Sequence, residues 1–223
     1  MTKEEKKIRN RSLNEAPKRE LKEEIGNAIT HGVGALIAVV MMILMLVRST
    51  NNLMIMASLI YGISMIVMMT MSCLYHSFKY GSRVKRLWRR FDYLSIYLLI
   101  GGTYAPLFLI YLGNTLGIIL FIVQWVFIIT GIIFVSIFGP GRIKWLHYLL
   151  YFLVGWSGVL FIPTWINSEV SLLIWILIGG VIYTLGMIPF CKKGIKNAHF
   201  IWHFFVLLGA ITHWIGIYLN LYL

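Results

Sequence analysis

The sequence has few acidic residues, few cysteines and little charge of any kind. Only 8 of its 223 residues are Asp or Glu, and Asp92 is the single aspartate. Two cysteines, Cys73 and Cys191, are too few for a disulfide-rich scaffold, and we expect both to be reduced thiols. After residue 24 no long polar stretch occurs, so the sequence does not predict a second, soluble domain.

Apolar residues, in contrast, dominate the composition. They make up 59% of the chain, and runs of roughly 20 residues, enough to cross a bilayer core, follow one another to the C-terminus. We therefore predict an all-α membrane protein, a bundle of seven transmembrane helices. Gly113 and Asn114 are turn residues and separate the third span from the fourth. The predicted spans are residues 25–47, 53–78, 91–112, 115–138, 145–166, 170–190 and 198–221.

The first 24 residues are charged and contain no apolar core. They are predicted to be a cytoplasmic tail, residues 1–24, rather than a signal peptide or a span, followed by the transmembrane domain, residues 25–223. Basic residues then fall in alternate loops: eight in the tail, six in 79–90, two in 142–144 and three in 192–196, against Arg48 alone on the other side. This pattern predicts a cytoplasmic N-terminus and an outside C-terminus. Because no secretion signal is recognisable, we expect a protein that resides in the inner (cytoplasmic) membrane.

The basic excess, 20 Lys and Arg against 8 acidic residues, does not indicate a nucleic-acid site. Its loop-by-loop alternation is typical of topology signals and of contacts with anionic lipid headgroups. The expected partners are therefore membrane lipids, with anionic headgroups at the cytoplasmic basic loops and no nucleic acid.

Four polar residues of separate segments are predicted at one membrane depth. His76 ends the second span, Asp92 begins the third, and His199 and His203 begin the seventh, all on the cytoplasmic side. His199 and His203 are spaced i and i+4, so their imidazoles project from one helix face and can bind one ion. With His76 they make a three-nitrogen set, and an open fourth position is the mark of a catalytic zinc (Zn²⁺).

Two further residues give this candidate site its chemistry. Ser72 precedes His76 by one helical turn and can hydrogen-bond a water or a substrate oxygen. Asp92 can offset the charge of the ion and is a candidate proton acceptor. The same histidines are also compatible with interhelical hydrogen bonds or a proton relay, and residues 200–202 lack the glutamate of the zincin motif.

The remaining histidines near this region are predicted not to bind the ion. His213 is about 15 Å from His203 along a helix, so it is expected to hydrogen-bond within the bundle. His31, about two turns into the first span, is expected to support the site or to pack beside it.

Three stretches taken together resemble the progestin and adipoQ receptor family, most closely its bacterial hemolysin III branch. They are "EEIGNAITHGVG" in the first span, "SCLYH" followed by "FDYLSIYLLIGGTYAP" in the second and third, and "HFIWHFFVLLGAITH" in the seventh. The resemblance implies seven helices with a cytoplasmic N-terminus. It further implies zinc ligation by His76, His199 and His203, with Asp92 and Ser72 in the same site and His213 outside it.

The resemblance also implies kinship with alkaline ceramidases, which hydrolyse a lipid amide, but it leaves the activity open. The first hypothesis is a zinc-dependent hydrolase acting on a membrane lipid amide or ester, with a role in membrane lipid homeostasis. The second is a non-enzymatic sensor or regulator of lipid state with structural zinc. The third is a pore-forming cytolysin, as the name hemolysin suggests.

Overall fold

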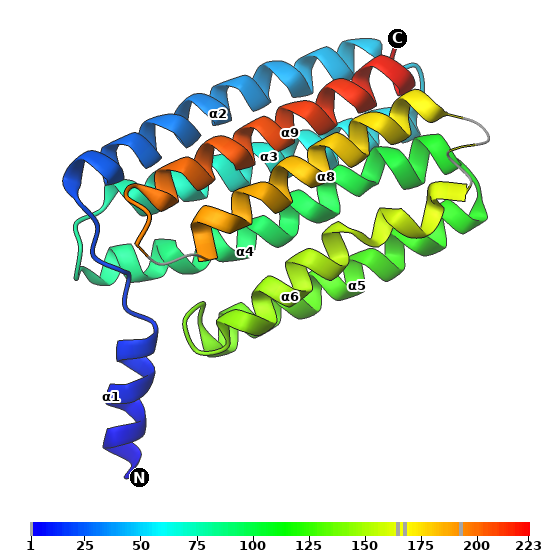
Figure 1. The fold of residues 1–223 in the computed structure, drawn as a ribbon. Helices are drawn as coiled ribbons and strands as arrows, with labels where there is room; N and C mark the ends of the chain where they lie inside the picture. The colour runs from blue at the N-terminus through cyan, green and yellow to red at the C-terminus, as the bar shows by residue number, and fades with distance from the viewer. Residues whose placement is uncertain (1, 164–165, 167–168, 192–193) are drawn as a thin grey trace.

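A computed structural model describes residues 2–163, 166, 169–191 and 194–223, and these residues form helices and no strand. The chain begins with a short polar helix that projects from one end of the bundle (Figure 1). In chain order the helices are α1 (Lys3–Leu13), α2 (Leu21–Arg48), α3 (Asn52–Ser77), α4 (Arg83–Pro106), the π-helical η1 (Leu107–Leu112), α5 (Thr115–Phe138), α6 (Lys144–Gly155), the 3₁₀ helix η2 (Ser157–Phe161), α8 (Val170–Cys191) and α9 (Ala198–Leu221).

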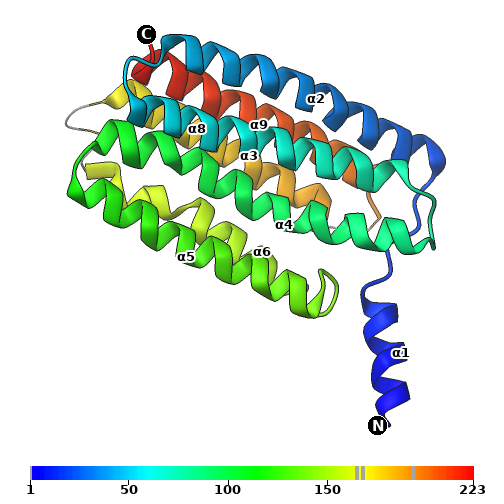
Figure 2. The ribbon, with the colours of Figure 1, turned by 180° about the vertical axis from the view of Figure 1, so that it is seen from behind.

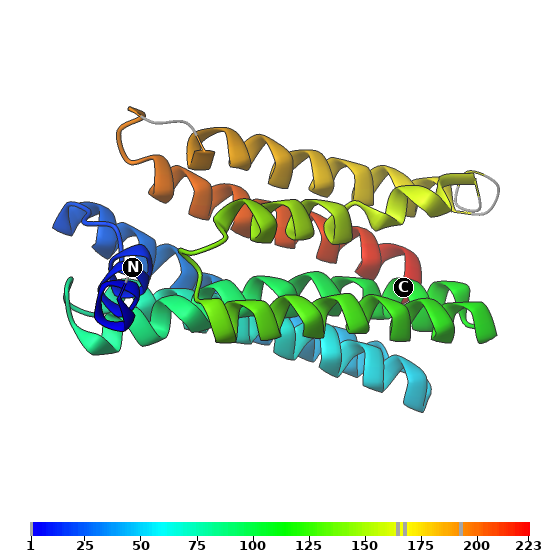
Figure 3. The ribbon, with the colours of Figure 1, turned by 90° about the horizontal axis from the view of Figure 1, so that it is seen from below.

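Among the described residues, six helices are long and apolar enough to cross a membrane. They are α2, α3, α4 continued by η1, α5, α8 and α9. The prediction of an all-α, multi-pass membrane protein is therefore confirmed. Seen from behind, α3 lies between α2 and α4 (Figure 2). Seen from below, α9 lies between α8 and the layer that contains α4, and it also packs on α2 (Figure 3).

The predicted fifth span, residues 145–166, is not one continuous α-helix. α6 covers 12 residues, about 18 Å, which is short of the bilayer core, and η2 follows after a break at Trp156. Residues 164 and 165 of this predicted span lie outside the described residues. The count of seven spans therefore rests on whether α6 and η2 cross the membrane as one interrupted segment.

Two side-chain hydroxyls, one from α4 and one from η2 itself, satisfy backbone groups at this break. The Tyr104 hydroxyl donates to the Gly155 carbonyl at 2.7 Å and accepts from the Gly158 N–H at 2.8 Å. The Ser157 hydroxyl donates to the Val154 carbonyl at 2.8 Å. Because an unpaired backbone group inside a bilayer costs several kcal/mol, these bonds explain why the helix can break here.

Side-chain caps set where three of the long helices begin. Asn51, Ser82 and Asn114 accept hydrogen bonds from backbone N–H groups in the first turns of α3, α4 and α5. The Ser82 cap starts α4 at Arg83, whereas the predicted third span began at residue 91. Gly113, with a φ of 55°, confirms the predicted turn between the third and fourth spans.

The segment between α1 and α2 contacts two other parts of the bundle at its basic end, the turn between α5 and α6 and the start of α4. The Asn14 amide donates to the Phe138 carbonyl at 3.1 Å and its oxygen accepts from the Gly141 N–H at 3.0 Å. Glu15 pairs with Arg86 at 3.0 Å. The start of α4 and the turn between α5 and α6 thus meet the N-terminal segment at one end, while α2 ends with Arg48 at the other (Figure 1).

Candidate metal centre

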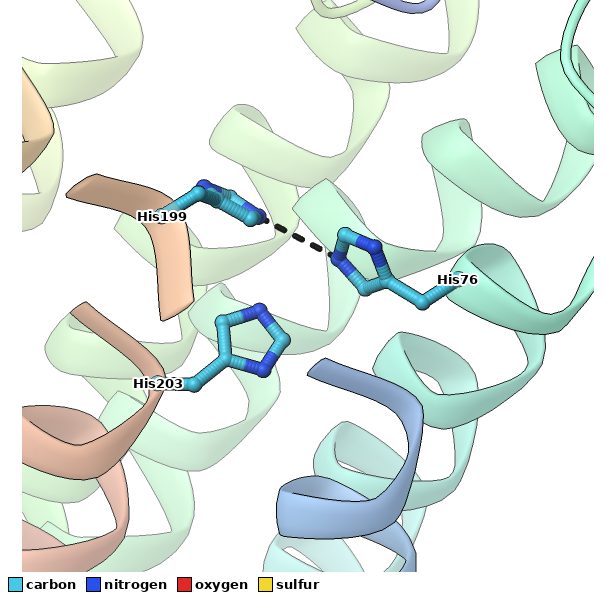
Figure 4. A group of neighbouring side chains, drawn as sticks. All are labelled: His76, His199 and His203. Atoms are coloured by element: carbon cyan, nitrogen blue, oxygen red, sulfur yellow. Dashed lines mark hydrogen bonds between the residues drawn. The ribbon is translucent and has the colours of Figure 1, made fainter. Parts of the chain in front are cut away.

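The three predicted metal ligands come together near the basic end of the bundle. His76 lies in the last turn of α3, and His199 and His203 lie in the first two turns of α9. One ring nitrogen from each lies within 4.8 Å of the others, and the rings face one another (Figure 4). The predicted convergence of these histidines is confirmed, and their binding of a metal stays a prediction.

Hydrogen bonds at Nδ1 leave the Nε2 atoms of two histidines available. His76 Nδ1 donates to the Glu24 carboxylate at 2.5 Å, and His203 Nδ1 donates to the backbone carbonyl of Asn27 at 3.2 Å. A neutral imidazole that donates through Nδ1 carries its lone pair on Nε2, which is the form that binds a metal. The donor set therefore suits a metal cation.

The spacing of one pair of these nitrogens is close to the spacing at a zinc ion. His76 Nε2 and His199 Nε2 are 3.2 Å apart. Two nitrogens bound tetrahedrally to one zinc at 2.0–2.1 Å are separated by ~3.4 Å. The pair thus already has nearly the separation that a shared zinc ion requires.

Ser72 and Asp92, the two further residues predicted for this site, are both buried. Ser72 lies in α3, one turn before His76, and Asp92 lies in the first half of α4. Both line a cavity together with His199 and His203. A hydroxyl and a carboxyl group thus line the same cavity as two of the histidines, and their place in the site and their chemical roles remain predictions.

His31 and His213 occupy the places predicted for them. The His31 ring stacks on His203 with a centroid distance of 3.8 Å, so it supports the cluster by packing. His213 Nε2 donates to the carbonyl of Ile176 at 3.0 Å, which confirms a hydrogen bond within the bundle. His213 is not in the group of histidines that approach one another.

Sequence reasoning assigned no role to three residues that surround the histidines: Glu24, Asn27 and Lys85. The Glu24 carboxylate contacts both His76 and Lys85, and the backbone of Asn27 holds His203. A signal was present in the sequence, because Glu24, Asn27 and His31 are spaced i, i+3 and i+7. They form a polar stripe on one face of an otherwise apolar helix.

The cavity beside the histidines has a volume of about 170 Å³. Its lining comes from α2, α3, α4, α6, α8 and α9, and it includes His199 and Asp92 as well as Trp156 and His213. Its lining is mostly apolar. A mostly apolar space that is also lined by ionisable side chains suits a ligand that has an apolar part and a polar group, as a lipid has.

The fold and this cluster define a multi-pass helical membrane protein with three histidines gathered near one end of its bundle. The family model described as Haemolysin-III related matches residues 19–214. The chain therefore belongs to the haemolysin-III related family, within the progestin and adipoQ receptor family that the sequence motifs resemble.

Two curated relatives agree with this assignment. "Hemolysin-3" of Bacillus cereus is 37% identical over 194 residues, which cover 85% of this chain and 88% of the relative. "Hemolysin-3 homolog" of Bacillus subtilis (strain 168) is 34% identical over 194 residues, covering 85% of this chain and 90% of the relative. Both alignments extend over nearly the whole length of the relatives.

Proposed function

We propose that this protein binds zinc through His76, His199 and His203 and hydrolyses an amide or ester of a membrane lipid. The observation that carries this proposal is the cluster of three imidazoles, two of which line one mostly apolar cavity together with the Asp92 carboxyl group and the Ser72 hydroxyl. When bound, zinc supplies a Lewis acid that polarises a carbonyl group and lowers the pKa of water to about 7.

Two side chains of the protein then supply proton transfer and charge stabilisation for the hydrolysis. Asp92 accepts the proton of the attacking water and passes it to the leaving group, as a general base and then a general acid. The Ser72 hydroxyl donates a hydrogen bond to the oxygen on which negative charge develops. The cavity holds the lipid tail, so the scissile carbonyl lies at the histidines.

We further propose seven spans, with the N-terminus in the cytoplasm and the C-terminus outside, in the inner membrane. α6 and η2 together form the interrupted fifth span. Support comes from the ends of the chain, because α1 and the C-terminus lie at opposite ends of the bundle (Figure 1), as an odd number of crossings requires. The basic loops at the α1 end are proposed to contact anionic lipid headgroups.

The hydrolase proposal is tested by incubating purified protein with a bacterial lipid extract and measuring the release of fatty acid. Asp92→Asn is expected to slow release by roughly 10²- to 10⁴-fold because it removes the general base. Ser72→Ala should also slow it, whereas Ser64→Ala is the matched control, since Ser64 is a buried serine deeper in α3 that bonds only to the Ile60 carbonyl at 2.6 Å. Equal release by wild type and Asp92→Asn contradicts the proposal.

A sensor or regulator of lipid state with structural zinc is the second candidate. It is favoured by the origin of the histidines, because zinc would join α3 to α9, two helices far apart in the sequence. In this case the protein binds zinc and no extract yields fatty acid. His199→Ala should then lower thermal stability, and added zinc should not restore it.

The names of the two relatives bring a third candidate, a cytolysin. Its test is the leakage of dye from liposomes at protein doses below those that disrupt bilayers in the manner of a detergent. The absence of leakage at such doses rejects it.

A further inference from the structure

Glu24, in the first turn of α2, makes two ionic contacts deep in the basic end of the bundle. Its Oε2 accepts from His76 Nδ1 at 2.5 Å, and its Oε1 accepts from Lys85 Nζ at 3.1 Å. The side chains of His76 and Lys85 are 0% and 1% exposed, and that of Glu24 is 12% exposed. A carboxylate with so little access to water is held by these partners rather than by solvent.

The ammonium group of Lys85 bonds to the Glu24 carboxylate and to two backbone carbonyls. Besides Glu24, its ammonium group donates to the carbonyl of Tyr75 at 3.1 Å and to that of Phe78 at 3.0 Å. An ammonium group has three N–H donors, and three acceptors are present. Lys85 therefore fixes Glu24 against the last turn of α3, the turn that carries His76.

The contact with Glu24 sets the form of the His76 ring. A carboxylate only accepts hydrogen bonds, so the proton of a neutral His76 lies on Nδ1 and the lone pair on Nε2. That Nε2 is the atom 3.2 Å from His199 Nε2 (Figure 4). A carboxylate at the far nitrogen also makes the imidazole a stronger donor toward a metal.

We infer that Glu24 is a positioning residue for metal binding, which acts through His76 and is itself anchored by Lys85. This inference rests on the proposed function. It makes α2 the helix that orients the ligands although it contributes none, since α2 also holds His203 through the backbone carbonyl of Asn27. Glu24 touches the ring of His76 and not the metal position.

The test is the Kd of the full-length protein for Zn²⁺ alone, measured in detergent by competition with a chelator. Glu24→Gln keeps the shape of the side chain and removes its charge, and we expect 10- to 100-fold weaker binding. The matched control is Glu23→Gln, the same change at the neighbouring residue in the same helical turn, which should leave the Kd unchanged. Glu23 is in neither the ion pairs nor the hydrogen bonds of the site.

A second readout separates positioning from a general loss of stability. With Co²⁺ in place of Zn²⁺, the visible absorption of Glu24→Gln should shift relative to wild type, because the His76 nitrogen becomes a weaker donor. If Glu24→Gln does not fold, Lys85→Met removes the anchor while keeping an apolar stem, and it should weaken Zn²⁺ binding in the same direction.

The outcomes distinguish the two proposals. Tight Zn²⁺ binding by wild type with an equal Kd and an unchanged Co²⁺ spectrum in Glu24→Gln overturns the inference and leaves the proposed function standing. No Zn²⁺ binding by wild type overturns both. Weaker binding by Glu24→Gln with an unchanged Glu23→Gln supports the inference.

Discussion

Two polar regions of the bundle, the histidine cluster and the break between α6 and η2, use buried polar groups in different ways. At the break, the hydroxyls of Tyr104 and Ser157 bond to backbone groups that the interrupted helix releases. At the cluster, Glu24 and the Asn27 carbonyl accept hydrogen bonds from the Nδ1 atoms of His76 and His203. The Nε2 atom of His76 faces that of His199 at 3.2 Å.

The difference shows how to separate a structural polar group from a functional one inside a membrane. Both regions carry polar groups at a depth where they are costly. In one region the polar groups bond to the backbone, whereas in the other the fold orients imidazole nitrogens toward one another, where a shared metal ion can replace their mutual contact. Such an orientation points to function more strongly than polarity alone.

Removal of zinc is the change with the largest expected effect, and it tests whether the histidine cluster depends on the metal while the break between α6 and η2 does not. A ligand held only by the folded state at about 1,000 times its Kd stabilises that state by about 4 kcal/mol, so a chelator should lower the unfolding temperature markedly. Hydrogen exchange should speed up at the last turn of α3 and the first turns of α9 and stay unchanged near Gly155. Equal changes in both regions would contradict the comparison.

Tyr104→Phe tests the break between α6 and η2, and we expect an effect of intermediate size on stability. The substitution keeps the ring and removes the hydroxyl that bonds to Gly155 and Gly158, leaving backbone groups without partners. We expect a loss of about 1–3 kcal/mol in the free energy of unfolding, followed by thermal unfolding in detergent. The Kd for Zn²⁺ serves as the control and should not change; a large rise in this Kd would show that the two regions are coupled.

His213→Ala has the smallest expected effect on metal binding, and it compares two histidines of the same helix, His213 and His203. His213 bonds to Ile176 rather than to the cluster and is about 15 Å from His203 along the helix. Because sites this far apart act independently, the Kd for Zn²⁺ should change by less than about twofold. His203→Ala, measured beside it, should abolish tight binding, and similar Kd values for the two variants would refute this division of α9.

Hydrophobic run length predicted most of the fold, and it failed where side chains decide the outcome. The runs located six membrane-length helices because apolar length is a direct consequence of bilayer thickness. The break in the predicted span 145–166 was missed, since it depends on the Tyr104 hydroxyl, which comes from another helix. The start of α4 was predicted too late because charged residues 83–90 look like a loop, whereas the Ser82 cap begins a helix there.

The candidate site was predicted from topology and spacing as far as its histidines, Ser72 and Asp92. His76 and His203 could be placed at one depth because span ends share a level in the membrane. The partners at Nδ1 could not be predicted, because they depend on how α2 is rotated against α3 and α9. Lys85 in particular reads as one of several basic loop residues, yet it is buried and anchors Glu24.

The central claim, that the three histidines bind one zinc ion, is tested most directly by elemental analysis of the purified protein. We expect about one zinc ion per chain in the wild type, with the metal lost in His76→Ala, His199→Ala and His203→Ala and retained in His213→Ala. A wild-type protein without zinc, or three histidine variants that keep it, would contradict the claim.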